Sequence, residues 1–190
     1  MDLFLNALIA AIMLVILVSL FRSEDQWSTV RIRFAFRYFT VQSNAFCAAA
    51  ALLLCLFPDA AWAWTLKFVA TAAVTVTMLT VLCFLGRLYG YRALLQGSDL
   101  IMHLINPLLA LVSFCGFERR GLRFPLLLAG LIPVLLYGAH YFYRILLCAP
   151  EKRWEDFYGF NRGGRWYISL PAMLSATLLI CLGLAALQNL

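Results

Sequence analysis

The sequence predicts an all-α fold, a polytopic membrane bundle of six transmembrane helices that forms one domain over residues 1–190. Composition is the first reason, because 64% of the residues are hydrophobic and only 13% are charged. A soluble domain carries about a quarter charged residues. The second reason is that the apolar residues form six continuous runs of about 18–25 residues, the length that a helix needs to cross a bilayer. Strands of a membrane barrel would instead alternate in polarity over about 10 positions.

The ends of the six runs are marked by charged residues and turn signals. The first run ends before Arg22 and is expected to be retained, because no basic segment precedes it and no small-residue cleavage site follows it. Pro58-Asp59 marks the turn after the second run, and the charged segment 118–121 separates the fourth from the fifth. The six predicted spans are residues 3–21, 38–57, 64–85, 100–117, 124–148 and 167–187.

Positively charged residues concentrate in three loops on one side of the predicted bundle. Eleven of the 15 Lys and Arg residues fall in or directly beside residues 22–37, 86–99 and 149–166. The positive-inside rule therefore places these loops in the cytoplasm and both termini on the opposite side. Because the basic residues flank membrane spans, the net charge of +6 favours lipid headgroups over nucleic acid as partners.

The six cysteines lie within or at the ends of spans, and none forms a CxxC pair. Thiols in such places behave as small apolar side chains, so the sequence indicates neither a disulfide framework nor a metal site. A phosphate-binding loop, a zinc-protease motif and a Gly-x-Ser-x-Gly elbow are also missing from the sequence. We therefore expect a function that needs no cofactor.

Two isolated polar residues stand at matching depth in the second and fourth spans. Thr40 lies near the start of the second span, and His103 lies near the start of the fourth. Both spans enter the membrane from the side of the long loops, so we expect the two side chains to meet. Polar groups at membrane depth are unfavourable and therefore indicate function. A hydroxyl beside an imidazole is the smallest set of groups that a covalent hydrolase requires, so the pair is a candidate catalytic site.

Further polar residues lie three or four positions away from this pair, and so share its helical faces. They are Ser43 and Asn44 beside the threonine, and Asp99 and Asn106 beside the histidine. The Asp99 carboxylate, one turn from His103, is expected to orient the imidazole. An oxyanion could be held by the Ser43 hydroxyl, by the side-chain amides of Asn44 and Asn106, or by the free N–H groups at the helix starts.

Residues near the loop side are candidates for binding the substrate. Arg37 and Arg87 could grip a lipid carboxylate, because the guanidinium group matches carboxylate geometry. His140 and Tyr141 lie near the end of the fifth span, and Asp156 lies in an aromatic and basic loop that is typical of an interfacial lid. These five residues are predicted to line the cavity mouth.

The same features allow other interpretations. Ser and Thr side chains often cap or join membrane helices, and His140 beside several tyrosines could be an interfacial anchor. A transporter or lipid-binding bundle without catalysis would also need a polar cavity in the membrane. A haem or quinone redox protein could use His103 and His140 as ligands or contacts.

Two motifs resemble one protein family. The segments RYFTVQSN at residues 37–44 and DLIMHLINP at residues 99–107, followed by the aromatic loop before the last span, are similar to the androgen-induced membrane protein family and its bacterial six-span relatives. The resemblance covers most of the chain in order and spacing. The animal members are intramembrane threonine hydrolases of fatty acid esters of hydroxy fatty acids.

The resemblance implies that Thr40 is the nucleophile and that His103, four residues before Pro107, is the base. It implies a lipid ester as the substrate and, through the bacterial relatives, a location in the bacterial inner membrane.

Overall fold

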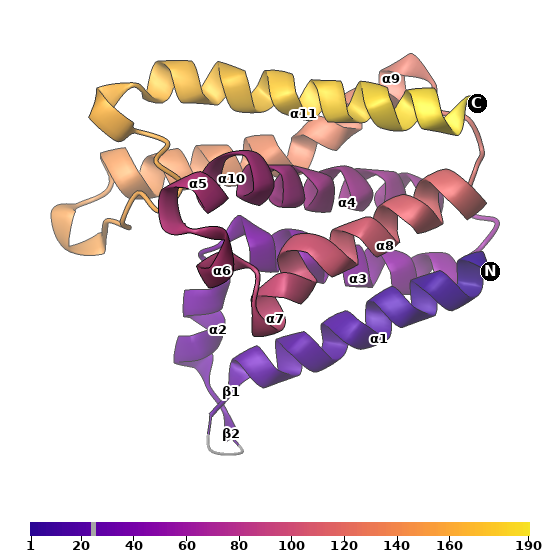
Figure 1. The fold of residues 1–190 in the computed structure, drawn as a ribbon, viewed down its shortest axis with the longest axis horizontal. Coiled ribbons are helices and arrows are strands. Elements are labelled where there is room, and N and C mark those ends of the chain that lie inside the picture. The colour runs from indigo at the N-terminus through magenta and orange to yellow at the C-terminus, as the bar shows by residue number, and fades with distance from the viewer. Residues whose placement is uncertain (24–25) are drawn as a thin grey trace.

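The computed structural model describes residues 1–23 and 26–190, and it confirms the all-α, six-helix architecture (Figure 1). Within this part of the chain, six helices are long and apolar enough to cross a membrane, which supports an integral membrane protein. Each predicted span overlaps one of these helices. The six helical spans are Asp2–Phe21, Phe39–Leu56, Ala61–Tyr89, Gly97–Phe117, Phe124–Leu147 and Trp166–Gln188.

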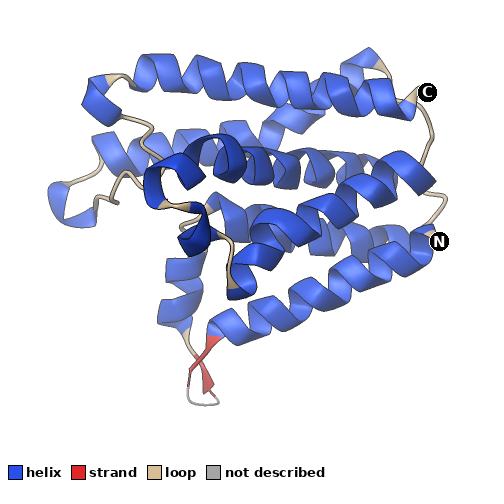
Figure 2. Cartoon of the chain, in the orientation of Figure 1, coloured by secondary structure: helices blue, strands red, loops and turns tan. Residues whose placement is uncertain are grey.

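Several spans consist of α-helical, π-helical or 3-10 segments that follow one another without a break. Two short antiparallel strands of two residues each follow the first span (Figure 2). The elements before the fourth span are α1 (Asp2–Phe21), β1 (Arg22–Ser23), β2 (Gln26–Trp27), α2 (Thr29–Ala35), α3 (Phe39–Leu56), α4 (Ala61–Thr80), η1 (Val81–Leu85), α5 (Gly86–Tyr89) and α6 (Tyr91–Leu94). The remaining elements are α7 (Gly97–Leu100), η2 (Ile101–Ile105), α8 (Asn106–Val112), η3 (Ser113–Phe117), α9 (Phe124–Leu127), η4 (Leu128–Leu131), α10 (Ile132–Phe142), η5 (Tyr143–Leu147), η6 (Pro150–Lys152), η7 (Arg162–Gly164) and α11 (Trp166–Gln188).

Helix α4 is the centre of the bundle. It packs against α3, α8, α10 and α11, while α1 and α11 lie on opposite sides of it (Figure 1). Small side chains such as Ala70, Ala72 and Ala73 are fully buried on α4, and they let neighbouring helices approach closely. Both termini lie at one end of the bundle, and the three long loops lie at the other (Figure 1).

The fourth span contains two π-helical turns, η2 and η3. A π-turn closes its hydrogen bonds over five residues rather than four, so it rotates the following side chains relative to a regular helix. His103 lies inside η2. Residues that share its face in an ideal α-helix are therefore displaced around the helix axis.

A buried polar network at the end of the bundle that carries the termini was not anticipated from the sequence. Lys67 Nζ lies 3.6 Å from Glu118 Oε1, with the side chains 0% and 3% exposed. Asn6 donates to Glu118 Oε1 at 2.6 Å and accepts from the Lys67 ammonium, while the Ser113 hydroxyl also donates to Oε1. The Trp64 indole donates to the Glu118 carbonyl at 2.7 Å. The network therefore joins α1, α4 and the end of η3.

Candidate functional site

The structure brings together the hydroxyl and the imidazole that the sequence singled out. Thr40 lies in the first turn of α3, and its Oγ1 is 3.3 Å from Nε2 of His103 in η2. His103 is buried at 7% exposure, and Thr40 is half-buried in the wall of a large cavity. The pair therefore joins a sheltered base to a hydroxyl that a ligand in the cavity can reach.

The second ring nitrogen fixes the tautomer of His103. Its Nδ1 is 2.7 Å from the carbonyl oxygen of Leu94, at the end of α6. A carbonyl only accepts hydrogen bonds, so Nδ1 carries the proton of the neutral ring and Nε2 is the acceptor. The Thr40 hydroxyl then donates to Nε2. This is the protonation state that a general base requires.

Asp99 does not take the orienting role predicted for it. The acceptor that holds the ring is the Leu94 carbonyl, and the Asp99 carboxylate forms no hydrogen bond or ion pair with the rest of the described chain. The physical reason is that both ring nitrogens are already engaged, Nδ1 by the Leu94 carbonyl and Nε2 by the Thr40 hydroxyl.

The polar residues predicted to hold an oxyanion instead brace the two helices. Asn44 donates to the carbonyl of Thr40 at 2.8 Å and to that of Met102 at 3.0 Å, and it accepts from Asn106 at 2.7 Å. The Ser43 hydroxyl lies 3.1 Å from the same Thr40 carbonyl and 2.9 Å from Thr77 Oγ1. Because both N–H groups of Asn44 are occupied, this side chain holds the backbones beside Thr40 and His103 in register.

Replacing Asn44 with alanine is expected to lower kcat by about tenfold or more, because small displacements of reacting groups have large effects on rate. The measurement is kcat and KM for ester hydrolysis in detergent, alongside an unfolding curve. Asn44→Gln keeps the amide and tests whether the bridge or the volume matters. A variant with unchanged kcat would remove Asn44 from the positioning role.

The residue that sequence reasoning missed is Tyr158. The amide of Phe39, the residue before Thr40, donates to its hydroxyl at 3.0 Å, and Tyr158 and Thr40 line the same cavity. Burial raises the pKa of Tyr158, although the hydrogen bond from the Phe39 amide acts in the opposite direction. The phenol therefore stays protonated at neutral pH and keeps a proton to donate. Its signal in the sequence was weak, since it lies in an irregular loop with several other aromatic residues.

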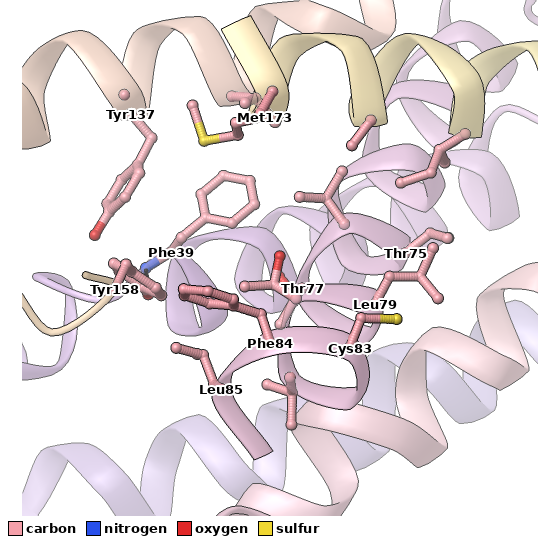
Figure 3. A pocket seen from close by; sticks show the side chains of 18 of the residues that line it. Phe39, Thr75, Thr77, Leu79, Cys83, Phe84, Leu85, Tyr137, Tyr158 and Met173 are labelled. Carbon is pink, nitrogen blue, oxygen red and sulfur yellow. Dashed lines mark hydrogen bonds between the residues drawn. The ribbon is translucent and has the colours of Figure 1, made fainter. Parts of the chain in front are cut away.

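The cavity beside Thr40 has a volume of about 830 Å³ and is mainly apolar (Figure 3). Phe39, Tyr137 and Tyr158 surround its end near Thr40, and Met173 of α11 covers it from the other side (Figure 3). Its wall follows α11 from Ser169 to Leu187. At 1.5 Å per helical residue this is about 27 Å, close to the thickness of the hydrocarbon core. The shape suits a long aliphatic chain whose reactive end lies near Thr40.

The five predicted substrate-binding residues lie in three places. Tyr141 lines the main cavity, and its hydroxyl donates to the Asp156 carboxylate at 3.1 Å. That carboxylate also accepts the backbone N–H groups of residues 160 and 161, so it shapes the loop that carries Tyr158. Arg37 and His140 pack against Trp154 outside this cavity. Arg87 is exposed and does not line the cavity.

Comparisons of the chain with protein-family models, curated proteins and solved structures found no match. Over the described residues, no group of three or more His, Cys, Asp or Glu side chains is arranged to hold a metal ion. Of the two histidines considered as haem ligands, His103 has both ring nitrogens in contact with Thr40 and Leu94. His140 packs edge-on against Trp154 and lines a separate cavity.

Proposed function

We propose that this protein is an intramembrane lipid ester hydrolase of the bacterial inner membrane, with Thr40 as nucleophile and His103 as general base. Its substrates are fatty acid esters of hydroxy fatty acids or related acyl esters. The observation that carries the proposal is the 3.3 Å approach of Thr40 Oγ1 to His103 Nε2 at one end of the long apolar cavity. The resemblance of residues 37–44 and 99–107 to threonine hydrolases supports the same assignment.

In the proposed reaction, Thr40 Oγ1 attacks the ester carbonyl carbon while its proton moves to Nε2 of His103. The tetrahedral intermediate collapses, and the departing alkoxide takes that proton and leaves as an alcohol. Water then attacks the acyl-threonine, with His103 accepting a proton from the water and returning it to Thr40 Oγ1 as the acid leaves. The Leu94 carbonyl stabilises the imidazolium that forms twice in the cycle.

Tyr158 is the proposed oxyanion donor. Its hydroxyl lies at the start of α3, where it accepts the Phe39 N–H, and it lines the same cavity as Thr40. The positive end of the helix dipole lies at the same place and favours negative charge on a carbonyl oxygen bound there. Donors aimed at the developing charge typically contribute most to the catalysis of acyl transfer.

Labelling with a fluorophosphonate tests the proposal directly, because such probes phosphonylate an activated hydroxyl. The expected result is one covalent adduct per chain, located at Thr40 by peptide mass spectrometry and lost in Thr40→Ala. Labelling that persists in Thr40→Ala, or no labelling of folded protein, would favour a transporter or binding bundle. A Soret band in the spectrum of the purified protein would favour a haem protein instead.

The variant Tyr158→Phe is expected to lower kcat by about 100-fold, the usual loss on removing one oxyanion donor. KM should change much less, because the ring still fills its place in the cavity wall. Tyr143→Phe is the matched control, since that tyrosine is half exposed to the surroundings and lies outside the cavity. Equal losses in both variants would mean that the Tyr158 hydroxyl has no special role.

A further inference from the structure

A second cavity of about 540 Å³ lies between α3, α4 and α10. Phe39 and Tyr137 line both cavities and so form the partition between them, while Thr40 faces only the larger one. Apart from His140 and Gln42 at one end, most of its wall is aliphatic or aromatic. This second cavity is not used by the proposed hydrolysis.

The second cavity is a groove along the outside of the bundle. Its wall on the fifth span runs from Ala129 to His140, which is about 17 Å at 1.5 Å per residue. This is roughly half of the 30 Å hydrocarbon core, or the depth of one leaflet. Ile132 and Leu136 in its wall are 50% and 69% exposed, so the groove opens sideways to the bilayer. A single lipid chain fits this length and this direction of entry.

A cluster of basic side chains surrounds Trp154 at the loop end of this groove. The guanidinium carbons of Arg37 and Arg144 lie 5.7 and 4.9 Å from the centre of its ring. The His140 ring packs edge-on against the same indole at 5.2 Å and also lines the groove. The two arginines therefore bring like charges to one aromatic ring, next to the point where the groove begins.

This cluster has unpaired donors, and no carboxylate of the described chain forms an ion pair with it. Neither Arg37 nor Arg144 forms an ion pair with any residue that the structure describes. Arg144 Nε and Trp154 Nε1 are both buried and have no hydrogen-bond partner in the described chain. The nearby loop carboxylate of Asp156 is occupied by Tyr141 and two backbone N–H groups. Buried donors without partners are unfavourable, so this arrangement favours binding of an anion.

We propose that this is a binding site for one anionic glycerophospholipid, separate from the hydrolase cavity. The phosphate is bound by Arg37, Arg144 and the indole N–H of Trp154, and one acyl chain lies in the groove between α3 and α10. Guanidinium groups match phosphate geometry, and basic residues at a membrane interface attract anionic headgroups. A free phosphate ion would satisfy the donors alike but would leave the apolar groove unfilled. The inference does not depend on the assignment of Thr40 and His103.

Native mass spectrometry of the delipidated protein in a neutral detergent tests the proposal. Phosphatidylglycerol is titrated against phosphatidylcholine with the same acyl chains, and glycerophosphoglycerol and inorganic phosphate serve as ligands without chains. We expect one phosphatidylglycerol to bind about tenfold or more tightly than phosphatidylcholine, which corresponds to the loss of one good charge-assisted contact. The two ligands without chains should bind at least about tenfold more weakly than the lipid.

Variants locate the site. Arg37→Gln with Arg144→Gln should abolish the preference for the anionic lipid, and Trp154→Phe should weaken it while keeping an aromatic ring in place. Arg87→Gln is the control, because that arginine is exposed and touches neither cavity. Unfolding curves without lipid establish that each variant is folded.

Three results would overturn the proposal. Equal binding of both phospholipids would show that the site does not recognise the anionic headgroup. Binding of inorganic phosphate as tight as that of the lipid would show that the site binds a free anion. An equal loss in Arg87→Gln would reduce the effect to general surface charge.

Discussion

Replacing Thr40 with alanine is expected to reduce ester hydrolysis by at least about 10³-fold, because the proposed nucleophile is removed while the bundle is left intact. His103→Ala should cause a loss of the same order, since a threonine hydroxyl without its base is a poor nucleophile. The Thr40→Ala/His103→Ala double variant should be little worse than either single variant, because the two groups act as a unit. The measurement is single-turnover hydrolysis of a lipid ester by purified protein.

Three further variants make this test specific to the pair. Thr75→Ala removes a hydroxyl from the same cavity that bonds only its own helix, at the Thr71 carbonyl, and activity should be nearly unchanged. Thr40→Ser retains the hydroxyl and should keep measurable activity. Asp99→Asn should behave like the parent protein, because the Leu94 carbonyl already orients His103. Full activity in Thr40→Ala would end the assignment.

Replacing Glu118 with glutamine is expected to destabilise the bundle by about 3–5 kcal/mol, the usual effect of leaving one member of a buried ion pair without its partner. The Lys67 ammonium is fully buried and would then face only neutral amide oxygens, with no carboxylate to balance its charge. Lys67→Met should have an effect of similar size, because the carboxylate would then be buried without a cation. Denaturant unfolding in mixed micelles measures both.

A double variant distinguishes the effect of removing the whole Lys67–Glu118 ion pair from the effect of leaving one of its charges buried alone. Lys67→Met with Glu118→Leu removes both charges, and it should be more stable than either single variant because no charge is left uncompensated. Arg119→Gln is the neighbouring control, since Arg119 is exposed and its side chain bonds only the Cys115 carbonyl within the described part of the chain. Its effect should be within about 0.5 kcal/mol of the parent protein. Additive losses in the double variant would argue against coupling between Lys67 and Glu118.

The spans were predictable because their signal is a property of many residues at once. An apolar run of this length has few stable alternatives in a bilayer, so composition and continuity located all six helices. The third helix extends to Tyr89, beyond the predicted end at residue 85, because helical geometry persists until Gly90 with φ of +87°. Glycine adopts that conformation without strain and ends the helix.

The meeting of Thr40 and His103 was also predictable, since both open spans that start from the same side. The positions of the groups around this pair were not predictable, because they depend on details of the backbone that no residue pattern reveals. The chain entering α7 places the Leu94 carbonyl against the ring, so a backbone group and not the Asp99 carboxylate orients His103. Tyr158 reaches the site from a loop without periodicity, so nothing in the sequence distinguished it from its aromatic neighbours.

The position of Tyr158 on a loop couples activity to the conformation of that loop. The Asp156 carboxylate accepts hydrogen bonds from Tyr141 and from two backbone amides, and these hold the loop against the bundle. Tyr158 then accepts a hydrogen bond from the amide of Phe39 at the start of α3. Any event that lifts residues 156–161 from the bundle would withdraw the phenol from Thr40 while leaving the threonine and histidine where they are. The proposed hydrolysis would then be switched between fast and slow turnover at the membrane surface, without any rearrangement of the transmembrane helices.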